Sequence, residues 1–319
     1  MQFPEELRIA AEAYAETFDR KTLIKAAEAV SARYREEKSS GEELVSSEAE
    51  IAAYSVVRMP ATFAAVSSAL GHALENYTGS ISTAADIGSG TGTAAWAISG
   101  LLSDSIETVH CCERTDSMRK LGERLMREAG FETDVRWQRF DVTRDTLPQS
   151  YDLITAAYML NELTDADRER AVLAMWEKTD GMLLIVEPGT MKGYANIMQA
   201  RKLLTANGAA IAYPCPAIAK CPMPQGDWCN MSARAARSKL HKQLKGADVP
   251  YEDEKFSALA AVRSSAAPCK SRILRHPQVA SGVITLHLCT PEGITDSKIT
   301  RSSKSFKQAR KAEWGDQLN

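Results

Sequence analysis

The chain has 319 residues and a mass of 34.9 kDa, with 44% hydrophobic and 25% charged residues and a net charge of −2. This length suits one large domain or two smaller ones, and the composition is typical of a globular protein. No run of about 18 apolar residues occurs, so we expect no membrane span. The acidic, amphipathic first 16 residues resemble neither a secretory signal nor an Arg-rich transit peptide, which favours a cytoplasmic protein. Reduced thiols and an odd number of cysteines, seven, argue against a disulfide framework.

The small net charge conceals an uneven distribution along the chain. Residues 191–319 contain 20 Lys and Arg against 9 Asp and Glu, a net charge of +11, whereas residues 1–190 contain 19 against 32, a net charge of −13. A cationic half of this size predicts contact with a polyanion, most simply RNA. The alternative is an ordinary solvated surface.

Hydrophobic periodicity divides the chain into five parts. Residues 1–78 are rich in Ala and Glu at helical spacing and predict a helical region, with Pro60 in the first turn of its last helix. Residues 79–212 alternate strand-like and helix-like segments, which predicts an α/β fold with a mostly parallel sheet. Residues 213–254 form a Cys/Pro-rich insertion that ends in a basic segment, 232–246, expected to be a helix. Residues 255–292 supply the final core strands, and residues 293–319 are expected to be a basic tail.

A glycine-rich turn joins the first strand of the alternating region to its first helix. The segment ADIGSGTGTAAWA places glycines at 88, 90 and 92, where a sharp turn lets a ligand approach the backbone. A dinucleotide site would prefer G-x-G-x-x-G, and here the third glycine comes one residue early. An ordinary tight turn in a Rossmann-like sheet is the alternative.

Three acids accompany this turn. Asp86 precedes it, Glu113 ends the second strand, where a carboxylate can accept hydrogen bonds from ribose hydroxyls, and Asp141 ends the third, where it can hold an adenine amino group. With these acids the segment resembles the class I S-adenosylmethionine-dependent methyltransferases. The resemblance implies that the cofactor-binding residues are Asp86, Gly88, Gly90, Gly92, Glu113 and Asp141.

The catalytic residues of such an enzyme are not evident. The segment AAYMLNELT, residues 156–164, ends the fourth strand but contains neither an N-P-P-Y tetrad nor a cysteine. Tyr158, Asn161 and Glu162 could line a methyl pocket. Asn161 could equally cap the next helix.

The segment PCPAIAKCPMPQGDWC, residues 214–229, holds three of the seven cysteines. Thiolates are soft ligands, so a C-x5-C-x7-C spacing predicts a metal site, either zinc or an iron–sulfur cluster. Buried free thiols are the alternative. A fourth ligand would come from Cys269 or Cys289, because Cys111 and Cys112 belong to the second strand and are expected in the core.

A second family resemblance covers more of the chain. It rests on residues 214–257, which contain the cysteine segment, and on the segments IVEPGT, YSVVRMPATFAA and ARKAEWGD. These segments resemble the methyltransferase-like family of mitochondrial small-ribosomal-subunit assembly factors and its bacterial relatives. The resemblance implies an S-adenosylmethionine fold, association with the small ribosomal subunit and its rRNA, and a 4Fe–4S cluster on Cys215, Cys221, Cys229 and Cys289. The sequence departs from the family at Ala217, Asn230, Met231 and Ala258, which alters the surroundings of a cluster and leaves its thiolates in place.

We therefore expect a methyltransferase-type core in which the metal-bound insertion presents cations to RNA phosphates, namely Arg234, Arg237, Lys239, Lys242 and Lys245, together with the basic tail. The acids at 252–254 are expected to pair with nearby Lys or Arg. Three functions remain open: an rRNA methyltransferase, a non-catalytic assembly factor, and a small-molecule methyltransferase with a structural zinc. Away from the ribosome we expect a monomer.

Overall fold

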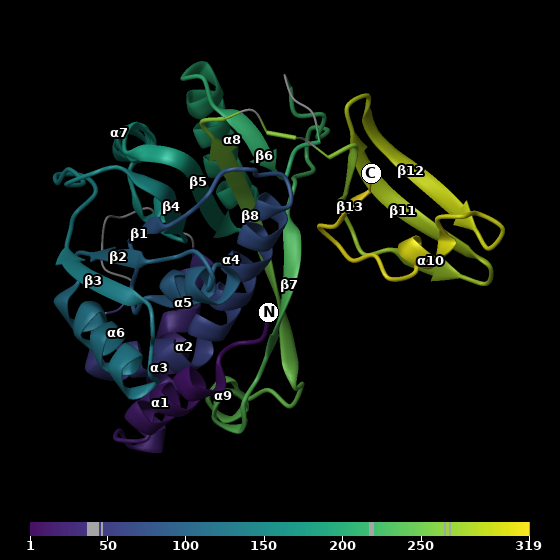
Figure 1. Cartoon of the computed structure of the whole chain (residues 1–319). Helices are drawn as coiled ribbons and strands as arrows, with labels where there is room; N and C mark the ends of the chain where they lie inside the picture. Colours follow the sequence, from purple (N-terminus) through teal and green to yellow (C-terminus); the bar gives the residue numbers. More distant parts are fainter. Residues whose placement is uncertain (37–44, 46, 217–219, 265, 268, 319) are drawn as a thin grey trace.

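The computed structural model describes the whole chain except residues 37–44, 46, 217–219, 265, 268 and 319 (Figure 1). Helices occupy the described part of residues 1–78, as predicted: α1 Glu5–Ala15, α2 Arg20–Glu36, α3 Glu48–Val57 and α4 Met59–Leu74. Pro60 lies in the first turn of α4, where its missing N–H has no helical partner to lose. None of the helices in the described residues is both long and apolar enough to span a membrane.

The largest element is an eight-stranded sheet. Its strands are β1 Thr83–Ile87, β2 Thr108–Glu113, β3 Asp134–Arg139, β4 Tyr151–Ala157, β5 Thr179–Pro188, β6 Ala210–Tyr213, β7 Met231–Ala236 and β8 Tyr251–Val262. The strand order is β3-β2-β1-β4-β5-β8-β6, with β7 paired to β8. Neighbours from β3 to β5 run parallel, and β8 is antiparallel to β5, β6 and β7. This strand order, with parallel neighbours from β3 to β5, confirms the predicted α/β fold with a mostly parallel, Rossmann-like sheet.

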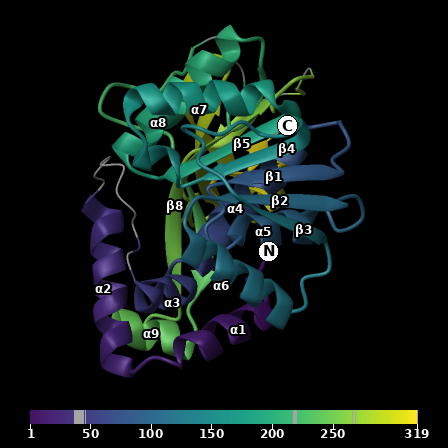
Figure 2. The same cartoon turned by 90° about the vertical axis from the view of Figure 1, so that its left-hand side faces the viewer.

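Helices cover both faces of the sheet (Figures 1 and 2). One face packs on α4 and α5 (Thr93–Leu101), and the other packs on α7 (Asp165–Glu177) and α8 (Met191–Ala206). On the same side as α5, α6 (Asp116–Glu128) packs on β2, β3 and α1. Two short helices of the main body are η1 (Leu160–Glu162) and α9 (Lys239–Lys245), and α9 lies beside α2 and α3. Because β1, β2, β3 and β4 run parallel, their C-terminal ends and the turns that follow them lie at the same edge of the sheet, beneath the N-terminal helices.

The prediction of one basic helix over residues 232–246 is wrong. Its first part is β7, in which Met231, Ala233 and Ala235 are buried and alternate with more exposed residues. This period of two is a strand signal, and pairing with the long β8 satisfies the backbone of β7. Only α9 is helical, and Ser238 caps it by accepting a hydrogen bond from His241 N at 3.1 Å.

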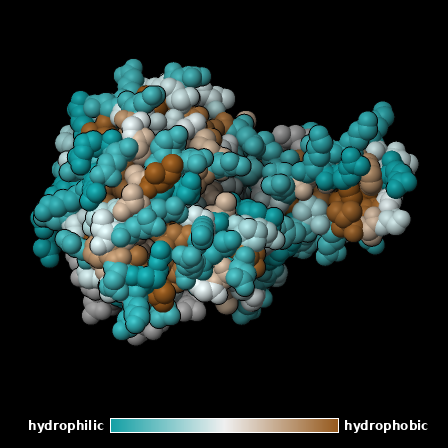
Figure 3. Space-filling model, turned by 90° about the horizontal axis from the view of Figure 1, so that it is seen from below, coloured by the Kyte–Doolittle hydropathy of each residue, from teal (hydrophilic) through white to brown (hydrophobic). Residues whose placement is uncertain are grey.

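Residues 271–318, here called the β-lobe, form a second sheet that projects from the main body (Figures 1 and 3). Its elements are β9 Ser271–Ile273, β10 Gln278–Ala280, β11 Val283–Thr290, β12 Gly293–Thr300, α10 Phe306–Ala309 and β13 Gln317–Leu318. A small apolar core holds it together, including Ile273, Ile284 and Leu286. The expected basic tail is therefore ordered structure, because β12 forms a hairpin with β11 and β13 pairs with β9.

Candidate functional site

The glycine turn has the predicted position between β1 and α5. Gly88, Gly90 and Gly92 have φ values of 69°, 56° and 81°, in the left-handed region that side chains disfavour. The amides of Gly88 and Ser89 both donate to the carbonyl of Cys112, at 2.8 and 3.2 Å. A Cβ at Gly88 would lie 2.9 Å from Met159 Cβ, so the turn and the end of β4 approach too closely for a side chain.

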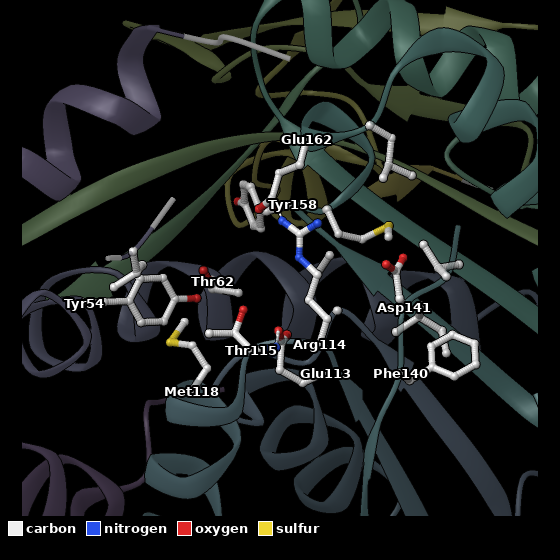
Figure 4. Close-up of a pocket in the computed structure, with 18 residues that line it drawn as sticks. Tyr54, Thr62, Glu113, Arg114, Thr115, Met118, Phe140, Asp141, Tyr158 and Glu162 are labelled. Atoms are coloured by element: carbon white, nitrogen blue, oxygen red, sulfur yellow. Dashed lines mark hydrogen bonds and ion pairs between the residues drawn. The ribbon is translucent and has the colours of Figure 1, made fainter. Parts of the chain in front are cut away.

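A pocket opens above this turn, at the C-terminal ends of β1, β2, β3 and β4 (Figure 4). Of the six predicted cofactor residues, Gly88, Gly90, Glu113 and Asp141 line it. Asp86 and Gly92 do not line it. The sequence pattern missed contributions from Val45, Tyr54 and Thr62, because nothing in it indicates that the N-terminal helical region closes over the strand ends.

Asp86 lies beneath the turn and contacts β4. It is 2% exposed, and its Oδ1 accepts a hydrogen bond from Thr155 Oγ1 at 2.8 Å. Burial raises the pKa of Asp86 to about 7, although the Thr155 hydrogen bond works against that rise. Asp86 thus joins β1 to β4 beneath the turn and does not face the pocket.

The two other acids are already engaged with backbone. The carboxylate of Glu113 accepts from Gly90 N and Thr115 N, both at 2.8 Å, and so joins the glycine turn to the start of α6. Asp141 accepts from Thr143 N at 3.0 Å and from Thr143 Oγ1 at 2.7 Å. Burial alone would raise the pKa of Asp141, but these hydrogen bonds outweigh it and lower the pKa. Both side chains face the pocket with fixed orientations, which suits a ligand with hydroxyl and amino donors.

Tyr158 lines the pocket, as the sequence allowed, and belongs to a hydrogen-bonded trio whose other members, Arg58 and Glu254, lie outside the lining and were not evident from the sequence. Tyr158 has φ 59°, and it donates its hydroxyl to Glu254 Oε1 at 2.9 Å. Arg58 closes the trio with Nη2 at 3.1 Å from the same oxygen and Nη1 at 3.4 Å from Oε2. Burial and the adjacent Glu254 charge raise the pKa of Tyr158 far above its usual range, so the hydroxyl keeps its proton. A non-glycine residue in this strained region is a feature that clusters at functional sites.

A buried carboxylate holds the segment after Tyr158 in place. Glu187, fully buried at the end of β5, accepts from Leu160 N at 3.1 Å and from Asn196 Nδ2 at 2.9 Å. Glu162 lines the pocket and lies 3.6 Å from Arg114 (Figure 4). Asn161 does not line the pocket, and it is not the helix cap, since Thr164 caps α7 by accepting from Asp167 N.

A second cavity, here called the thiol cavity, is lined by the four predicted metal ligands Cys215, Cys221, Cys229 and Cys289. They come from three places: the stretch after β6, the loop before β7, and β11 of the β-lobe. Cys269 is buried outside this lining, and Cys111 and Cys112 lie in the core, as predicted. Ala258 also lines the cavity, whereas Ala217 lies outside the described residues.

The thiols of this cavity influence one another. Burial and the neighbouring thiols of Cys215, Cys221 and Cys289 raise the pKa of Cys229 well above its usual range, and burial with neighbouring thiols raises that of Cys289 to about 12. Tyr194 Oη lies 3.4 Å from Cys221 Sγ, and Arg201 and Arg272 also line the cavity. Among the described residues, no group of three or more His, Cys, Asp or Glu side chains is arranged to hold a metal ion. The metal assignment therefore stays a prediction.

The five cations predicted to contact RNA divide into two groups. Arg234 and Arg237 pair with Asp253 and Glu252 across the β7–β8 ladder, with shortest N–O distances of 2.7 and 2.8 Å. The prediction that the acids at 252–254 pair with nearby cations is thus confirmed for Glu252 and Asp253, whereas Glu254 pairs with Arg58 of the helical region. Lys239, Lys242 and Lys245 lie on α9.

A denser group of cations lies on the β-lobe. Six cations recur about every third residue from the end of β12 to the residues just after α10, and all six are exposed. They are here called the cation strip: Lys298, Arg301, Lys304, Lys307, Arg310 and Lys311. No acid interrupts residues 298–311.

Comparison with known proteins gives one family. The family model described as "Mitochondrial small ribosomal subunit Rsm22" matches residues 48–319. A curated relative, the mitochondrial ribosome assembly protein METTL17 of Homo sapiens, is 28% identical over 291 residues, which cover 83% of this chain. The matched region spans 61% of the length of that relative.

Solved methyltransferases are similar at low identity. A putative RNA methyltransferase from Pyrococcus horikoshii is 15% identical, with a TM-score of 0.40 over 61% of this chain and 79% of that one. Magnesium protoporphyrin IX methyltransferase from Synechocystis PCC 6803, with S-adenosylmethionine bound, is 16% identical, with a TM-score of 0.41 over 73% and 90%. Scores this low carry no argument about function.

Proposed function

Because this chain belongs to the Rsm22 family of the mitochondrial small ribosomal subunit, we propose that it acts in the assembly of a small ribosomal subunit. In this proposal it binds S-adenosylmethionine in the pocket at the glycine turn and rRNA through its cationic half. The observation that carries the RNA part is the cation strip, six cations without an intervening acid. Such a strip suits the phosphate backbone, which supplies most of the affinity of sequence-independent binding.

The pocket suits the cofactor in the chemistry of its lining. Glu113 and Asp141 offer carboxylates with fixed orientations, and the glycines leave the backbone accessible. Hydroxyl groups of a ribose and an amino group of a purine are the donors that such carboxylates accept from. Bound S-adenosylmethionine would supply an activated methyl group.

We propose further that Cys215, Cys221, Cys229 and Cys289 hold a 4Fe–4S cluster. Four thiols on one cavity are the donor set that iron–sulfur clusters use. A single zinc ion held by the same four thiolates is the alternative. When bound, the cluster would order the proline-rich loop.

Methyl transfer to rRNA is the second candidate function, and the strained Tyr158 favours it. This residue ends β4 beside the pocket, where it could position an acceptor group. Its hydroxyl donates a hydrogen bond to Glu254, so a methyl-acceptor group placed here would contact a side chain that is fixed in position and keeps its proton.

Purified precursors of the small subunit, incubated with methyl-labelled S-adenosylmethionine, test these functions together. We expect the protein to bind both the particle and the cofactor, and Gly90→Arg to abolish cofactor binding while retaining the particle. Gly130→Arg is the matched control, since Gly130 also has a positive φ but a Cβ there would meet no atom within 4 Å. If the wild type labels the rRNA and Gly90→Arg does not, methyl transfer to rRNA is established. If the wild type binds the particle and the cofactor but the rRNA stays unlabelled, the protein is an assembly factor without methyl transfer. Failure of the wild type to bind either would contradict the proposal.

A further inference from the structure

The thiol cavity lies where three parts of the molecule meet. Tyr194, Ile197 and Arg201 of α8 form one side, and the described residues of the cysteine segment, 214–216 and 220–230, form another. The third side is the β-lobe, which contributes Arg272, Leu274 and Cys289. One of the four thiols thus belongs to a different sheet from the rest of the site.

Arg272 is a buried charge at this junction. It is 0% exposed, and its guanidinium donates to the carbonyls of Pro214 at 3.0 Å and Gly315 at 2.9 Å. It also lies over the ring of Tyr213 at 4.9 Å. No carboxylate forms an ion pair with it in the described part of the chain. A buried cation without a counter-charge is costly, so its position beside the thiol cavity needs an anion.

The thiols provide that anion when they are ligands. Four thiolates carry more negative charge than an iron–sulfide core carries positive charge, which leaves a centre of net negative charge. Arg201 and Arg272 line the same cavity as these thiols. Two buried or nearly buried guanidinium groups therefore face the cavity in which a net anion is proposed.

Three side chains of the β-lobe donate hydrogen bonds to the cysteine segment, and Asp316 of the β-lobe also lies 4.0 Å from His72 of α4. Arg272 contacts Pro214, Arg275 Nη2 donates to Asp227 Oδ1 at 2.6 Å, and Trp314 Nε1 donates to the carbonyl of Asn230 at 2.8 Å. All three acceptors lie at or within a few residues of a proposed cysteine ligand. In the described chain, no strand of the β-lobe pairs with the large sheet.

We propose that Arg272 is the counter-charge of the inorganic centre, and that the loaded centre fixes the β-lobe, with its cation strip, to the methyltransferase core. This inference rests on the proposed cluster. A proline-rich segment has little apolar surface of its own to order it, so loss of the centre releases the acceptors that Arg272, Arg275 and Trp314 use. The orientation of the cation strip relative to the cofactor pocket then depends on the state of the centre.

Hydrogen exchange on the full chain tests the attachment without any substitution. Protein reconstituted with iron and sulfide is compared with the same protein after the iron is removed by a chelator. We expect about tenfold faster amide exchange in residues 214–230 and 271–318 after removal, and unchanged exchange in β1, β4 and β5. Equal exchange in both forms of a protein that demonstrably held iron would overturn the attachment and leave the cluster standing. A wild type that takes up no iron would overturn the cluster itself.

Arg272→Gln tests the counter-charge, and Arg275→Gln is its matched control. Arg275 also joins the β-lobe to the cysteine segment, but it is half-buried and does not line the cavity. We expect Arg272→Gln to lose iron to a chelator about tenfold faster than Arg275→Gln and to have a more negative reduction potential, because removing a nearby cation disfavours the reduced centre. Arg272→Lys, which keeps the charge, should retain a potential close to wild type even if it is less stable. Equal iron retention and potential in Arg272→Gln and Arg275→Gln would overturn the counter-charge role.

Discussion

Tyr158 and Glu254 lie 96 positions apart in the chain, yet the hydroxyl of the first donates to the carboxylate of the second at 2.9 Å. This hydrogen bond joins the end of β4 to β8, and Arg58 joins both to the start of α4. Tyr158, which lines the pocket at the glycine turn, is thus held in place by residues of the helical region and of the antiparallel strand β8.

Tyr158→Phe should lower the free energy of unfolding by about 1 kcal/mol, because it removes one hydrogen bond and leaves the buried Glu254 with Arg58 as its partner. Tyr251→Phe is the control, since that ring is 39% exposed. Urea denaturation of both variants measures the difference. Equal stability would show that the trio contributes nothing to the fold.

Gly88→Ala should destabilise the protein more than Gly130→Ala does. Both residues have nearly equal φ values, 69° and 68°, so both substitutions carry a cost of about 1–2 kcal/mol for the left-handed backbone. Only at Gly88 would the new Cβ also overlap Met159 Cβ, at 2.9 Å. Thermal unfolding of the two variants measures how much stability the overlap with Met159 costs. An equal loss of stability in both variants would mean that the turn moves to accommodate the new Cβ.

Asp86→Asn should flatten part of the pH dependence of stability. The pKa of Asp86 is about 7 in the folded protein, above its value of 3.8 when exposed. The stabilisation associated with its proton is therefore complete near pH 4 and is lost as pH rises to about 7. Between about pH 5 and pH 8 the wild type should lose about 3 kcal/mol more unfolding free energy than the variant. The Asp86→Asn variant should still lose some unfolding free energy over this pH range, in part through Glu187, because burial also raises the pKa of Glu187 to about 7. If the stability of wild type and variant changed in parallel with pH, the raised pKa of Asp86 would be contradicted.

Arg237→Ala should cost more stability than Arg234→Ala. The pair of Arg237 with Glu252 is largely buried, with side chains 15% and 14% exposed, and its loss leaves a buried carboxylate beside His241. We expect a loss of about 3 kcal/mol there and of at most about 1 kcal/mol at Arg234, whose side chain is 59% exposed. Chemical denaturation measures the unfolding free energy of both variants. A larger loss in Arg234→Ala than in Arg237→Ala would contradict the view that the buried pair contributes more to stability.

Removing cations from the strip should weaken RNA binding in a salt-dependent way. The triple variant Lys304→Ala, Lys307→Ala and Arg310→Ala should reduce the slope of log affinity against log salt by about 2, as expected for three lost contacts to single-stranded RNA. Lys21→Ala, Lys25→Ala and Lys120→Ala remove three cations from the acidic half as a control. Filter binding across a salt series measures both, and equal slopes would place the RNA elsewhere.

Local patterns predicted the sheet and the glycine turn because their signals are contained in short stretches. The alternation of strands and helices and the position of Gly88, Gly90 and Gly92 need no knowledge of distant contacts. The error over residues 232–246 had a readable warning, since Met231, Ala233 and Ala235 alternate with polar or exposed positions.

Tertiary contacts account for what the sequence concealed. Arg58 and Glu254 are ordinary charged residues until the fold brings them to Tyr158. The cysteine spacing left the choice between Cys269 and Cys289 open, and the family resemblance pointed to Cys289, which lines the cavity with the other three cysteines.

Iron and inorganic sulfide content, measured with the visible absorption spectrum of anaerobically purified protein, tests most directly whether these thiols hold a cluster. The wild type should contain iron and sulfide in equal amounts with a broad visible band, and Cys289→Ser should lose most of both while Cys269→Ser retains them. Zinc alone, or iron content unaffected by Cys289→Ser, would contradict the proposed centre.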